Sequence, residues 1–356
     1  MDQYNIAVLM GDGIGPEVVN QSIKVLNKVS SRFGFKVNYI FSDIGAAADK
    51  YKNHLPKAAI DSCKKSDSIL MGTVGDKVCS NLPLKRSPEQ AFLNIKRELN
   101  LFADIRPVII FDSLRDMSPI KEEYINKVKN ILIVKELLGG IYFGKKARHF
   151  EDGKVLAYDT EMYREDEIIR IAKLAFSLAQ KRSKKLVSVS KANMLETSKL
   201  WQEAVNSVSE DFKDVKLTHM TIDNCAMQII KAPSQFDVIL TSNLFGDILS
   251  VLASVLTGSI GLLAYANVRQ DKFGLYGPVG GSALDIAGKN TANPIASILS
   301  AAMMLRYSLS EFEASYKIEE AVNKAIKIGR TKDIHTQGTI LLSCSEMGDL
   351  ICKYIS

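Results

Sequence analysis

The segment Asn243-Leu-Phe-Gly-Asp-Ile-Leu-Ser250 places a carboxylate, Asp247, at a position where proteins often bind ligands. An apolar run, residues 238–240, precedes it, and apolar residues at 248, 249, 251 and 252 follow it. This pattern predicts a strand, a short loop and the first turn of a helix. Open α/β sheets bind their ligands at the carboxyl ends of strands, so Asp247 is a candidate ligand-binding residue. A carboxylate at the start of a helix can instead cap that helix, and this second interpretation stays open at this point.

The glycine-rich segment Gly11-Asp-Gly-Ile-Gly-Pro-Glu17 is a second candidate for ligand binding. Residues 4–10 before it are apolar and predict a buried strand, while Pro16 and Glu17 suit the first turn of a helix. The spacing is Gly-x-Gly-x-Gly-Pro, whereas the dinucleotide fingerprint requires Gly-x-Gly-x-x-Gly. The residues alone therefore predict a tight strand-to-helix turn and not a Rossmann nucleotide site.

Cysteine and histidine give no sign of a disulfide framework or a zinc site. The five cysteines form no Cys-x-x-Cys pair, and the four histidines are scattered without the spacing of a metal pair. We expect reduced thiols and structural histidines.

The chain has a formal net charge of +6 and one basic run, residues 181–185. No aromatic residues interleave with these charges, as they do in proteins that bind single-stranded nucleic acid. The run follows a helical pattern, so we interpret it as a solvated helix terminus. No nucleic-acid partner is expected, although the positive surplus helps to attract an anionic substrate.

Length and composition indicate a globular protein of two lobes. A chain of 356 residues is too long to form one simple hydrophobic core. The hydrophobic and charged contents of 46% and 24% are ordinary for a soluble globular protein. No apolar run approaches the ~20 residues of a membrane span. Residues 1–6 lack a signal-peptide pattern, which predicts a cytoplasmic protein without a membrane partner. A transit peptide removed upstream of residue 1 is the alternative.

Strand and helix patterns alternate along the chain and predict an α/β sheet with helices on both faces. The helix predicted at 88–100 places Glu89, Phe92, Leu93 and Lys96 on one face. The stretch 258–288 lacks a regular pattern and is predicted to be a long binding loop. Strands are predicted at 4–10, 37–41, 68–71, 108–111, 130–134, 186–189, 219–222 and 238–240. The other helices are predicted at 16–33, 58–64, 160–181, 193–209, 226–231, 294–308, 312–328 and 346–355, and a loop at 81–87.

Five motifs in this order resemble one family over nearly the whole chain. The segments 11–17 and 243–250 are two of them, and the others are Gly139-Gly-Ile-Tyr-Phe-Gly144, Lys191-Ala-Asn193 and the pair 281–288 and 292–294. The chain resembles the β-decarboxylating dehydrogenases of the isocitrate/isopropylmalate dehydrogenase family. The resemblance implies that family's two-domain α/β fold, with residues 1–101 and 257–356 as a discontinuous cofactor-side domain. Residues 102–256 would form the dimerisation and metal/substrate domain of a homodimer whose active sites share residues across subunits.

The resemblance implies an enzyme that oxidises a 2-hydroxy diacid with NAD and then releases the β-carboxylate as carbon dioxide. The expected substrate is 3-isopropylmalate, which becomes 4-methyl-2-oxopentanoate in leucine biosynthesis. The family's divalent ion, Mg²⁺ or Mn²⁺, would be bound by Asp247 and by Asp223 of the neighbouring subunit. Lys191 resembles the lysine that helps to deprotonate the substrate hydroxyl, and Tyr142 resembles the acid that protonates the enolate.

The same resemblance assigns residues to the rest of the substrate. Arg106 would bind a carboxylate, and Lys96 and Lys135 stand where the family usually has two more arginines. Lysine keeps the charge but lacks the planar fork that grips a carboxylate with two parallel bonds. The substrate side chain is expected to meet Glu89, Phe92, Leu93 and Met194, and Phe92 and Met194 replace the usual Leu and Val.

On the cofactor side, Ile14, Asp285, Ile286 and Asn293 resemble the family's NAD-binding residues. Asp285 resembles the acid that accepts hydrogen bonds from the adenosine ribose, and a carboxylate there disfavours the 2′-phosphate of NADP.

Departures from the family concentrate at the site. Val251 replaces a third metal-binding Asp, and Gly277 a Glu near the nicotinamide. Further departures are Leu138 for Thr, Ser190 for Asp, Leu284 for Pro, and Asp-Lys-Val-Cys-Ser at 76–80. Three explanations remain open: a retuned enzyme acting on a different 2-alkylmalate, a weakened enzyme, or a non-catalytic ligand-binding or regulatory paralogue.

Overall fold

The computed structural model describes residues 2–76, 87–128 and 130–355. The chain folds as two compact units. Unit 1 contains residues 1–101, 109–119 and 257–356, and unit 2 contains residues 102–108 and 120–256. The domain boundaries at residues 101 and 256 stay a prediction. Most of the predicted loop at 81–87 and of the departures at 76–80 lies outside the described residues.

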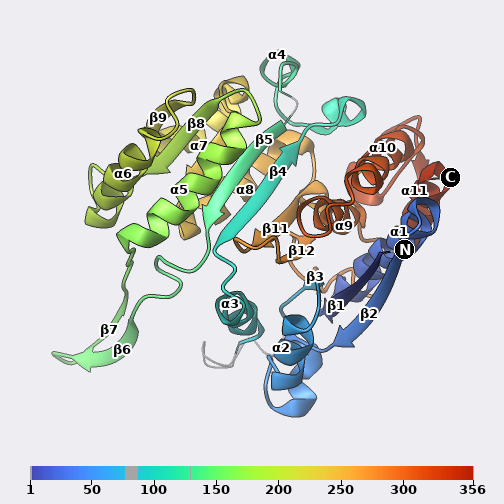
Figure 1. Cartoon of the computed structure of the whole chain (residues 1–356), viewed down its shortest axis with the longest axis horizontal. Coiled ribbons are helices and arrows are strands. Elements are labelled where there is room, and N and C mark those ends of the chain that lie inside the picture. Colours follow the sequence, from blue (N-terminus) through green and yellow to red (C-terminus); the bar gives the residue numbers. More distant parts are fainter. Residues whose placement is uncertain (1, 77–86, 129, 356) are drawn as a thin grey trace. The chain divides into compact units, whose positions relative to one another are not determined.

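Unit 1 is built on a mostly parallel sheet (Figure 1). Strand β1 (Gln3–Gly11) pairs in parallel with β2 (Lys36–Ser42) and with β3 (Ser68–Thr73). Strand β12 (Gly274–Pro278) is parallel to β3, and β11 (Ala264–Val268) is antiparallel to β12. The order within the unit is β2-β1-β3-β12-β11.

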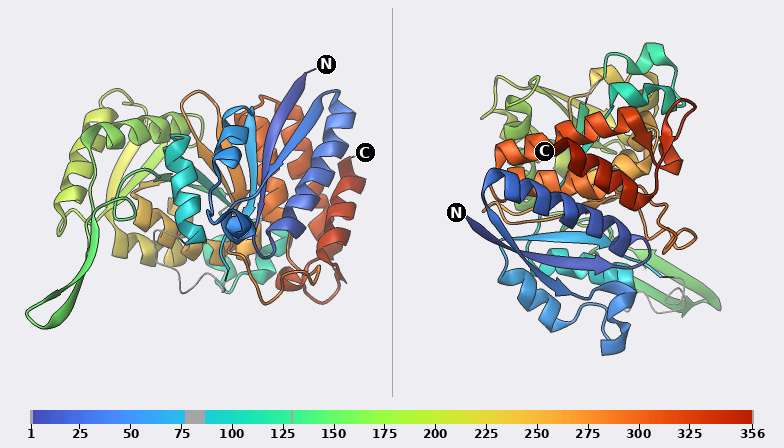
Figure 2. Two further views of the ribbon diagram at one scale, coloured as in Figure 1. Left: turned by 90° about the horizontal axis from the view of Figure 1, so that it is seen from below. Right: turned by 90° about the vertical axis from the view of Figure 1, so that its right-hand side faces the viewer.

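Helices cover both faces of this sheet. Ala7 and Leu9 of β1 face a core that contains residues of α2 (Lys57–Lys64) and α3 (Pro88–Glu98). Successive strand residues point to opposite faces, so Ile6 and Val8, also fully buried, belong to the other face. That face is covered by α1 (Gly15–Phe33), which packs with α9 (Ile295–Tyr307), α10 (Phe312–Ile328) and α11 (Cys344–Ile355) (Figure 2). The remaining short elements are η1 (Gly45–Tyr51), η4 (Asp112–Met117), η7 (Ile260–Leu262), β13 (Gly329–Arg330), η8 (Lys332–Ile334) and β14 (Ile340–Leu341).

Unit 2 contains a second run of strands in the order β4-β5-β10-β8-β9. These strands are β4 (Ala103–Ile109), β5 (Asn130–Glu136), β10 (Val238–Thr241), β8 (Lys185–Ser190) and β9 (Lys216–Thr221). The pairs β5–β10, β10–β8 and β8–β9 are parallel, so their carboxyl ends lie at one edge. The sequence motifs at Lys135, Lys191 and Asn243 follow or end these strands, as the sequence predicts.

The helices of unit 2 lie on both faces of its strands. Helices α5 (Glu165–Gln180) and α6 (Glu196–Ser209) pack on one face, and α7 (Ile222–Lys231) and α8 (Asn243–Ser254) on the other (Figure 1). The adjacent residues Lys135 and Glu136 of β5 illustrate this division, because Lys135 contacts α8 and Glu136 faces α5. Short elements of unit 2 are α4 (Glu122–Ile125) and η5 (Pro233–Gln235), and η6 (Val255–Thr257) spans the boundary between the units in the sequence.

A two-stranded hairpin, β6 (Lys146–Glu151) and β7 (Lys154–Asp159), extends from unit 2 (Figure 1). Asp152 and Gly153 connect its strands, both with positive φ, as the type I′ hairpin turn requires. The sequence pattern did not lead us to expect strands here, although the Asp-Gly pair was a usable signal for the turn.

The predicted α/β fold class is confirmed, but some local predictions are wrong. The supposed loop 258–288 contains β11 and β12, whose short and almost wholly buried runs lack the alternation that marks a half-buried strand. The strand predicted at 108–111 begins earlier, at Ala103, and ends at Ile109. Its first half was missed because the polar residues Asp104 and Arg106, which are buried within it, interrupt the apolar pattern. Across the described residues, no helix combines the length and apolar character that a membrane crossing needs.

Candidate active site

Asp247 lies in the second turn of α8, one helical turn later than the sequence suggested. Helix α8 begins at Asn243, with Ser242 as its N-cap, so Asp247 is the fifth helical residue. The interpretation of Asp247 as a helix cap is therefore wrong. Gly246, one residue earlier, lets the stem of Lys135 cross the helix, because a Cβ there would lie 2.4 Å from Lys135 Cγ.

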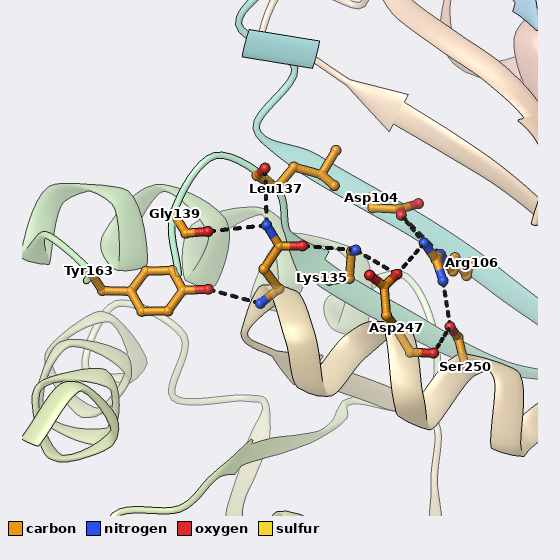
Figure 3. A network of polar contacts seen from close by, with 9 residues as sticks. Asp104, Arg106, Lys135, Leu137, Gly139, Tyr163, Asp247 and Ser250 are labelled. Carbon is orange, nitrogen blue, oxygen red and sulfur yellow. Dashed lines mark hydrogen bonds and ion pairs between the residues drawn. The ribbon is translucent and has the colours of Figure 1, made fainter. Parts of the chain in front are cut away.

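Three groups converge on the Asp247 carboxylate, and Figure 3 shows two of them, Arg106 and Lys135. Arg106 Nη2 and Lys135 Nζ each donate to Asp247 Oδ1 at 2.8 Å, and the Tyr142 hydroxyl is also hydrogen-bonded to this carboxylate. Arg106 and Lys135 are both buried, whereas the Asp247 side chain is partly exposed. The structure thus brings together four of the predicted site residues from β4, β5, α8 and the turn after β5.

A second carboxylate balances the buried cations. Asp104, which is wholly buried, accepts from Arg106 Nε at 2.9 Å and pairs with Nη2 at 2.7 Å. Ser250 Oγ accepts from Arg106 Nη1 at 2.6 Å. Two carboxylates thus face two cations, and their hydrogen bonds fix the direction of the guanidinium plane. Sequence reasoning missed Asp104, although a charged residue two positions before Arg106 in a buried strand was a usable signal.

Burial and charge shift the proton affinities of this cluster. Burial would lower the pKa of Arg106, but the carboxylates of Asp104 and Asp247 outweigh it and raise that pKa. Burial lowers the pKa of Lys135, and the carboxylate of Asp247 opposes the change. Burial, helped by the charge of Asp247, raises the pKa of Tyr142, so its phenol stays protonated and can donate.

Lys191 and Asp223 form a separate pair. Lys191 Nζ, just after β8, is bonded to Asp223 Oδ1 in the first turn of α7. The hydrogen bond from Lys191 lowers the pKa of the Asp223 carboxyl group. The Asp223 side chain is 65% exposed, unlike the buried cations of the first cluster.

Asp223 and Asp247 are the carboxylates that the sequence analysis assigns to a divalent ion. Asp223 and Asp247 provide the hard oxygen donors that Mg²⁺ and Mn²⁺ prefer. Within the described part of the chain, no group of three or more His, Cys, Asp or Glu side chains could hold a metal ion. Val251, which replaces the family's third carboxylate, is 47% exposed. The donor chemistry of these two carboxylates therefore fits such an ion.

Lys96 and Phe92, two of the four residues of α3 that were predicted to bind the substrate, contact each other. Lys96 Nζ lies 3.6 Å from the centroid of the Phe92 ring, and Lys96 is almost fully buried. Phe92 also packs against Tyr265 and the core of unit 1, which supports its ring beneath the ammonium. Glu89 is exposed and Leu93 half-buried on the same helix. In unit 2, Met194 is 72% exposed.

Unit 1 also contains a cavity of about 450 Å³ beside the glycine-rich loop. Three predicted cofactor residues, Ile14, Ile286 and Asn293, line it, whereas Asp285 is exposed beside it. Ile14 and Ile286 pack on buried residues that include Val18, which gives the cavity an apolar wall. The cavity is also lined by Lys332 and Asp333, which sequence reasoning missed, and Asp333 Oδ2 accepts from Asn293 Nδ2 at 3.0 Å.

The glycine-rich loop is held by its own aspartate. Asp12 accepts from the backbone N–H groups of Ala46, Ala47 and Gly75 at 2.8–3.0 Å. Gly13 has φ +59°, and a Cβ there would lie 2.0 Å from the carbonyl oxygen of Ser282. The predicted tight turn is confirmed, and it borders the cavity through Ile14.

The other residues that depart from the family pattern are packed within the fold. Gly277 is inside β12, where a Cβ would lie 2.7 Å from the carbonyl oxygen of Met71. Ser190 is buried at the end of β8, and its hydroxyl oxygen accepts a hydrogen bond at 3.3 Å from a side-chain amide of α6. Leu138, in the turn after β5, and Leu284 are both half-buried.

Comparison with known protein families shows to which family the chain belongs. The profile of the isocitrate/isopropylmalate dehydrogenase family matches residues 5–351. The chain belongs to that family. The resemblance inferred from the five motifs is therefore confirmed.

Relatives within the isocitrate/isopropylmalate dehydrogenase family match the whole chain. The 3-isopropylmalate dehydrogenase of Clostridium acetobutylicum is 48% identical over 355 residues, covering 99% of each chain. The enzyme of the same name from Salmonella typhi is 48% identical over 357 residues, covering 99% of this chain and 98% of the relative. Among solved structures, isocitrate dehydrogenase from Methylococcus capsulatus aligns with a TM-score of 0.87 at 31% identity, covering 99% of each chain.

Proposed function

We propose that the chain catalyses the NAD-dependent oxidative decarboxylation of 3-isopropylmalate to 4-methyl-2-oxopentanoate in leucine biosynthesis. The observation that carries this proposal is the cluster of Arg106, Lys135, Tyr142 and Asp247, within a chain that matches 3-isopropylmalate dehydrogenases over its full length. An anionic substrate with two carboxylates needs buried cations, and this cluster provides two of them. The intact cluster also argues against the non-catalytic alternative.

Arg106 and Lys135 are proposed to bind substrate carboxylate oxygens. Both are held by Asp247 from one side, and Arg106 also by Asp104, so they are oriented before the substrate arrives. Lys96 is proposed as a third cation, positioned on α3 by its contact with Phe92. The side chain of the 2-alkylmalate would then meet Glu89, Phe92, Leu93 and Met194.

Lys191 and Tyr142 are proposed to move the protons. Lys191 takes the proton of the substrate hydroxyl, directly or through a relay, and its pairing with Asp223 orients its amine. After carbon dioxide leaves, the Tyr142 hydroxyl protonates the carbon of the resulting enolate. The raised pKa of Tyr142 keeps this proton in place until that step.

When bound, NAD would supply the hydride acceptor, and Mg²⁺ or Mn²⁺ would supply a Lewis acid for the substrate hydroxyl and its neighbouring carboxylate. We assign NAD to the cavity lined by Ile14, Ile286 and Asn293, with Asp285 beside the adenosine ribose. The metal is assigned to Asp247 and to Asp223 of a second copy.

A homodimer would supply that second copy. Three apolar side chains of α7 and α8, namely Met227, Ile248 and Val251, are about half exposed. The β6–β7 hairpin also exposes Phe150, Val155, Leu156 and Tyr158. Exposed apolar side chains that gather in large patches mark protein interfaces, and these side chains are candidates for one. We propose that these surfaces associate in a cytoplasmic homodimer without nucleic-acid or membrane partners.

The function is tested by following NADH formation with the purified chain, 3-isopropylmalate, Mn²⁺ and NAD. We expect turnover that requires all three additions, and little turnover when NADP replaces NAD. The matched control is Lys191→Met, which nearly keeps the volume of the side chain and removes the proposed base. Other 2-alkylmalates in the same assay test whether Phe92 and Met194 have changed the preferred side chain. Turnover equal to that of the control with every 2-alkylmalate would reject the proposal.

A further inference from the structure

The turn after β5 connects two groups of the proposed site. Lys135 precedes the turn 137–140 by two residues, and Tyr142 follows it by two. Leu137 N donates to the carbonyl oxygen of Phe102 at 2.9 Å, and Gly140 N to that of Met162 at 2.8 Å. The conformation of this turn therefore determines how the Tyr142 hydroxyl lies relative to the Lys135 ammonium.

Glu136 holds one side of the turn through its N–H groups. Its Oε1 accepts from Leu138 N at 2.8 Å, and its Oε2 from Gly139 N at 2.7 Å. Glu136 is wholly buried, on the face of β5 opposite Lys135, so it cannot reach a substrate bound by that lysine. Two N–H groups held by two different oxygens of one carboxylate leave the turn little freedom to rotate.

Asn243 holds the other side through the carbonyl groups. Its Nδ2 donates to the carbonyl oxygens of Leu137 at 3.2 Å and Gly139 at 3.1 Å, while its Oδ1 accepts from Lys135 Nζ at 2.9 Å. An ammonium only donates and a carbonyl only accepts, so the orientation of this amide is fixed by its partners. Asn243 thus connects the turn to the ammonium that also contacts Asp247.

Tyr163 closes the arrangement. Its hydroxyl accepts from Asn243 N at 2.8 Å, and its ring lies against the turn (Figure 3). A Cβ at Gly139 or Gly140 would lie 2.6 Å from Tyr163 atoms, and Gly140 has φ +78°. Glycines at both positions allow the turn to lie between Tyr163 and the two clamping side chains.

We propose that Glu136 and Asn243 are positioning residues that clamp the turn 137–140 and thereby set the places of Lys135 and Tyr142. The inference rests on the proposed function, because it names what the clamp is for. Neither residue reacts. Glu136 acts through the turn, and Asn243 acts through the turn and Lys135.

The protonation state of Glu136 makes the clamp sensitive to pH. Burial raises the pKa of Glu136 to about 7, while the N–H groups of Leu138 and Gly139 oppose that rise. Glu167 raises it further and Arg170 lowers it, both from α5, and Tyr163 is also near. The ionised carboxylate accepts both N–H groups, whereas the neutral acid turns an O–H toward one of them. The clamp is therefore complete above pH 7 and weakened below it.

The first experiment measures the pH dependence of kcat in Glu136→Gln. Glutamine offers one accepting oxygen and places an amide N–H against the second donor, so it imitates the protonated acid. We expect kcat at pH 8 to fall about 10-fold to 100-fold, with a smaller change in KM, because Tyr142 is displaced. The step near pH 7 should disappear from the profile. The matched control, Glu165→Gln at an exposed position of α5, should keep the wild-type profile.

Stability separates positioning from a merely structural role. The folded-state pKa of Glu136 is raised above the unfolded value, so its stabilising effect is present at acid pH and is lost as pH rises toward 7. Glu136→Gln should therefore be at least as resistant to urea as the wild type at pH 8, while being less active. A variant that loses activity only in proportion to lost stability would overturn the inference.

Hydrogen exchange tests the clamp without catalysis. The amides of Leu138 and Gly139 should exchange faster in Glu136→Gln, and faster at pH 6 than at pH 8 in the wild type after correction for the intrinsic rate. Asn243→Asp should keep the bond to Lys135 but repel both carbonyl oxygens, and it too should loosen the turn. An inactive wild type with this exchange pattern would reject the function but keep the clamp. Unchanged exchange in both variants would overturn the clamp, whatever the activity.

Discussion

The cluster around Asp247 and the Lys191–Asp223 pair contain the same kinds of charges in opposite surroundings. Lys135 is 2% exposed, and Asp247 is contacted by two cations from β4 and β5. Asp223 is 65% exposed and forms an ion pair with Lys191. The first cluster is thus complete within one chain. The second presents its carboxylate at the surface, as a group that serves a neighbouring subunit would.

Removing either proton-transfer group, Lys191 or Tyr142, should cause the largest loss of kcat. We expect Lys191→Met and Tyr142→Phe each to lower kcat by about two to four orders of magnitude, because an acid–base group is lost. Both changes keep the volume of the side chain nearly constant, so urea midpoints should stay close to the wild type. Steady-state NADH formation gives the rates. Near-normal kcat in both variants would remove the proposed mechanism.

Mixing these two variants tests whether the two regions act across subunits. Suppose that the Lys191–Asp223 pair of each chain serves the site that contains Tyr142 of the other chain. After the two variants are unfolded and refolded together, each heterodimer would then carry one site with both Lys191 and Tyr142 intact and one site with neither. Random pairing should then restore about one quarter of wild-type activity. The control is each variant refolded alone. If the mixture stays inactive although heterodimers form, the Lys191–Asp223 pair serves its own chain.

Stability should distinguish the buried region from the exposed one. Lys135→Met leaves Asp247, which keeps Arg106, and the Asn243 amide oxygen each without one partner, and losing a buried hydrogen-bond partner costs about 1–3 kcal/mol. Asp223→Asn should leave the urea midpoint nearly unchanged, because the pair it removes is solvent-screened. Trp201, on α6 of the same unit, reports both transitions by fluorescence. Equal midpoints for the two variants would show that the difference in burial has no energetic consequence.

The smallest expected effect concerns the missing carboxylate. Val251→Asp adds an oxygen ligand one turn beyond Asp247 and should tighten Mn²⁺ binding about threefold to tenfold. The position is about half exposed, so the new charge should cost little stability. Calorimetric titration measures the affinity, and the thermal midpoint should rise more with Mn²⁺ than in the wild type. Asn at position 251 provides the uncharged control. An affinity no higher than the wild type's would place the ion away from residue 251.

The sequence predicted features that depend on local pattern. Helix α10 was predicted with its observed bounds, because the periodicity of its buried residues is strong. The start of α8 was misplaced, because Asn243 belongs to its first turn and the glycine at 246 resembled a loop residue. Strands β11 and β12 were missed, since burial on both faces removes the alternation that reveals a strand.

Contacts between distant residues could not be predicted from the chain alone. The amide of Asn243 contacts Lys135 across 108 positions, and Arg106 contacts Asp247 across 141. The motifs identified these residues individually, but only the fold shows that Asp104 and Glu136 support them from behind. A buried polar residue in a strand indicates that a partner exists without saying which one.

Unit 1 is formed from both ends of the chain, and this division determines the order in which the parts of the protein can fold during synthesis. Ile69 of β3 pairs with Leu275 of β12, and β1, β2 and β3 therefore leave the ribosome long before their partner strand is synthesised. At typical elongation rates the ~200 intervening residues take roughly 10–40 s. During this interval the side of β3 that will bond to β12 is an exposed strand edge of the kind that binds chaperones or aggregates. Residues 102–108 and 120–256 are complete by then, so unit 2 with the Asp247 cluster can fold first, and the cavity lined by Ile14 and Asn293 forms last.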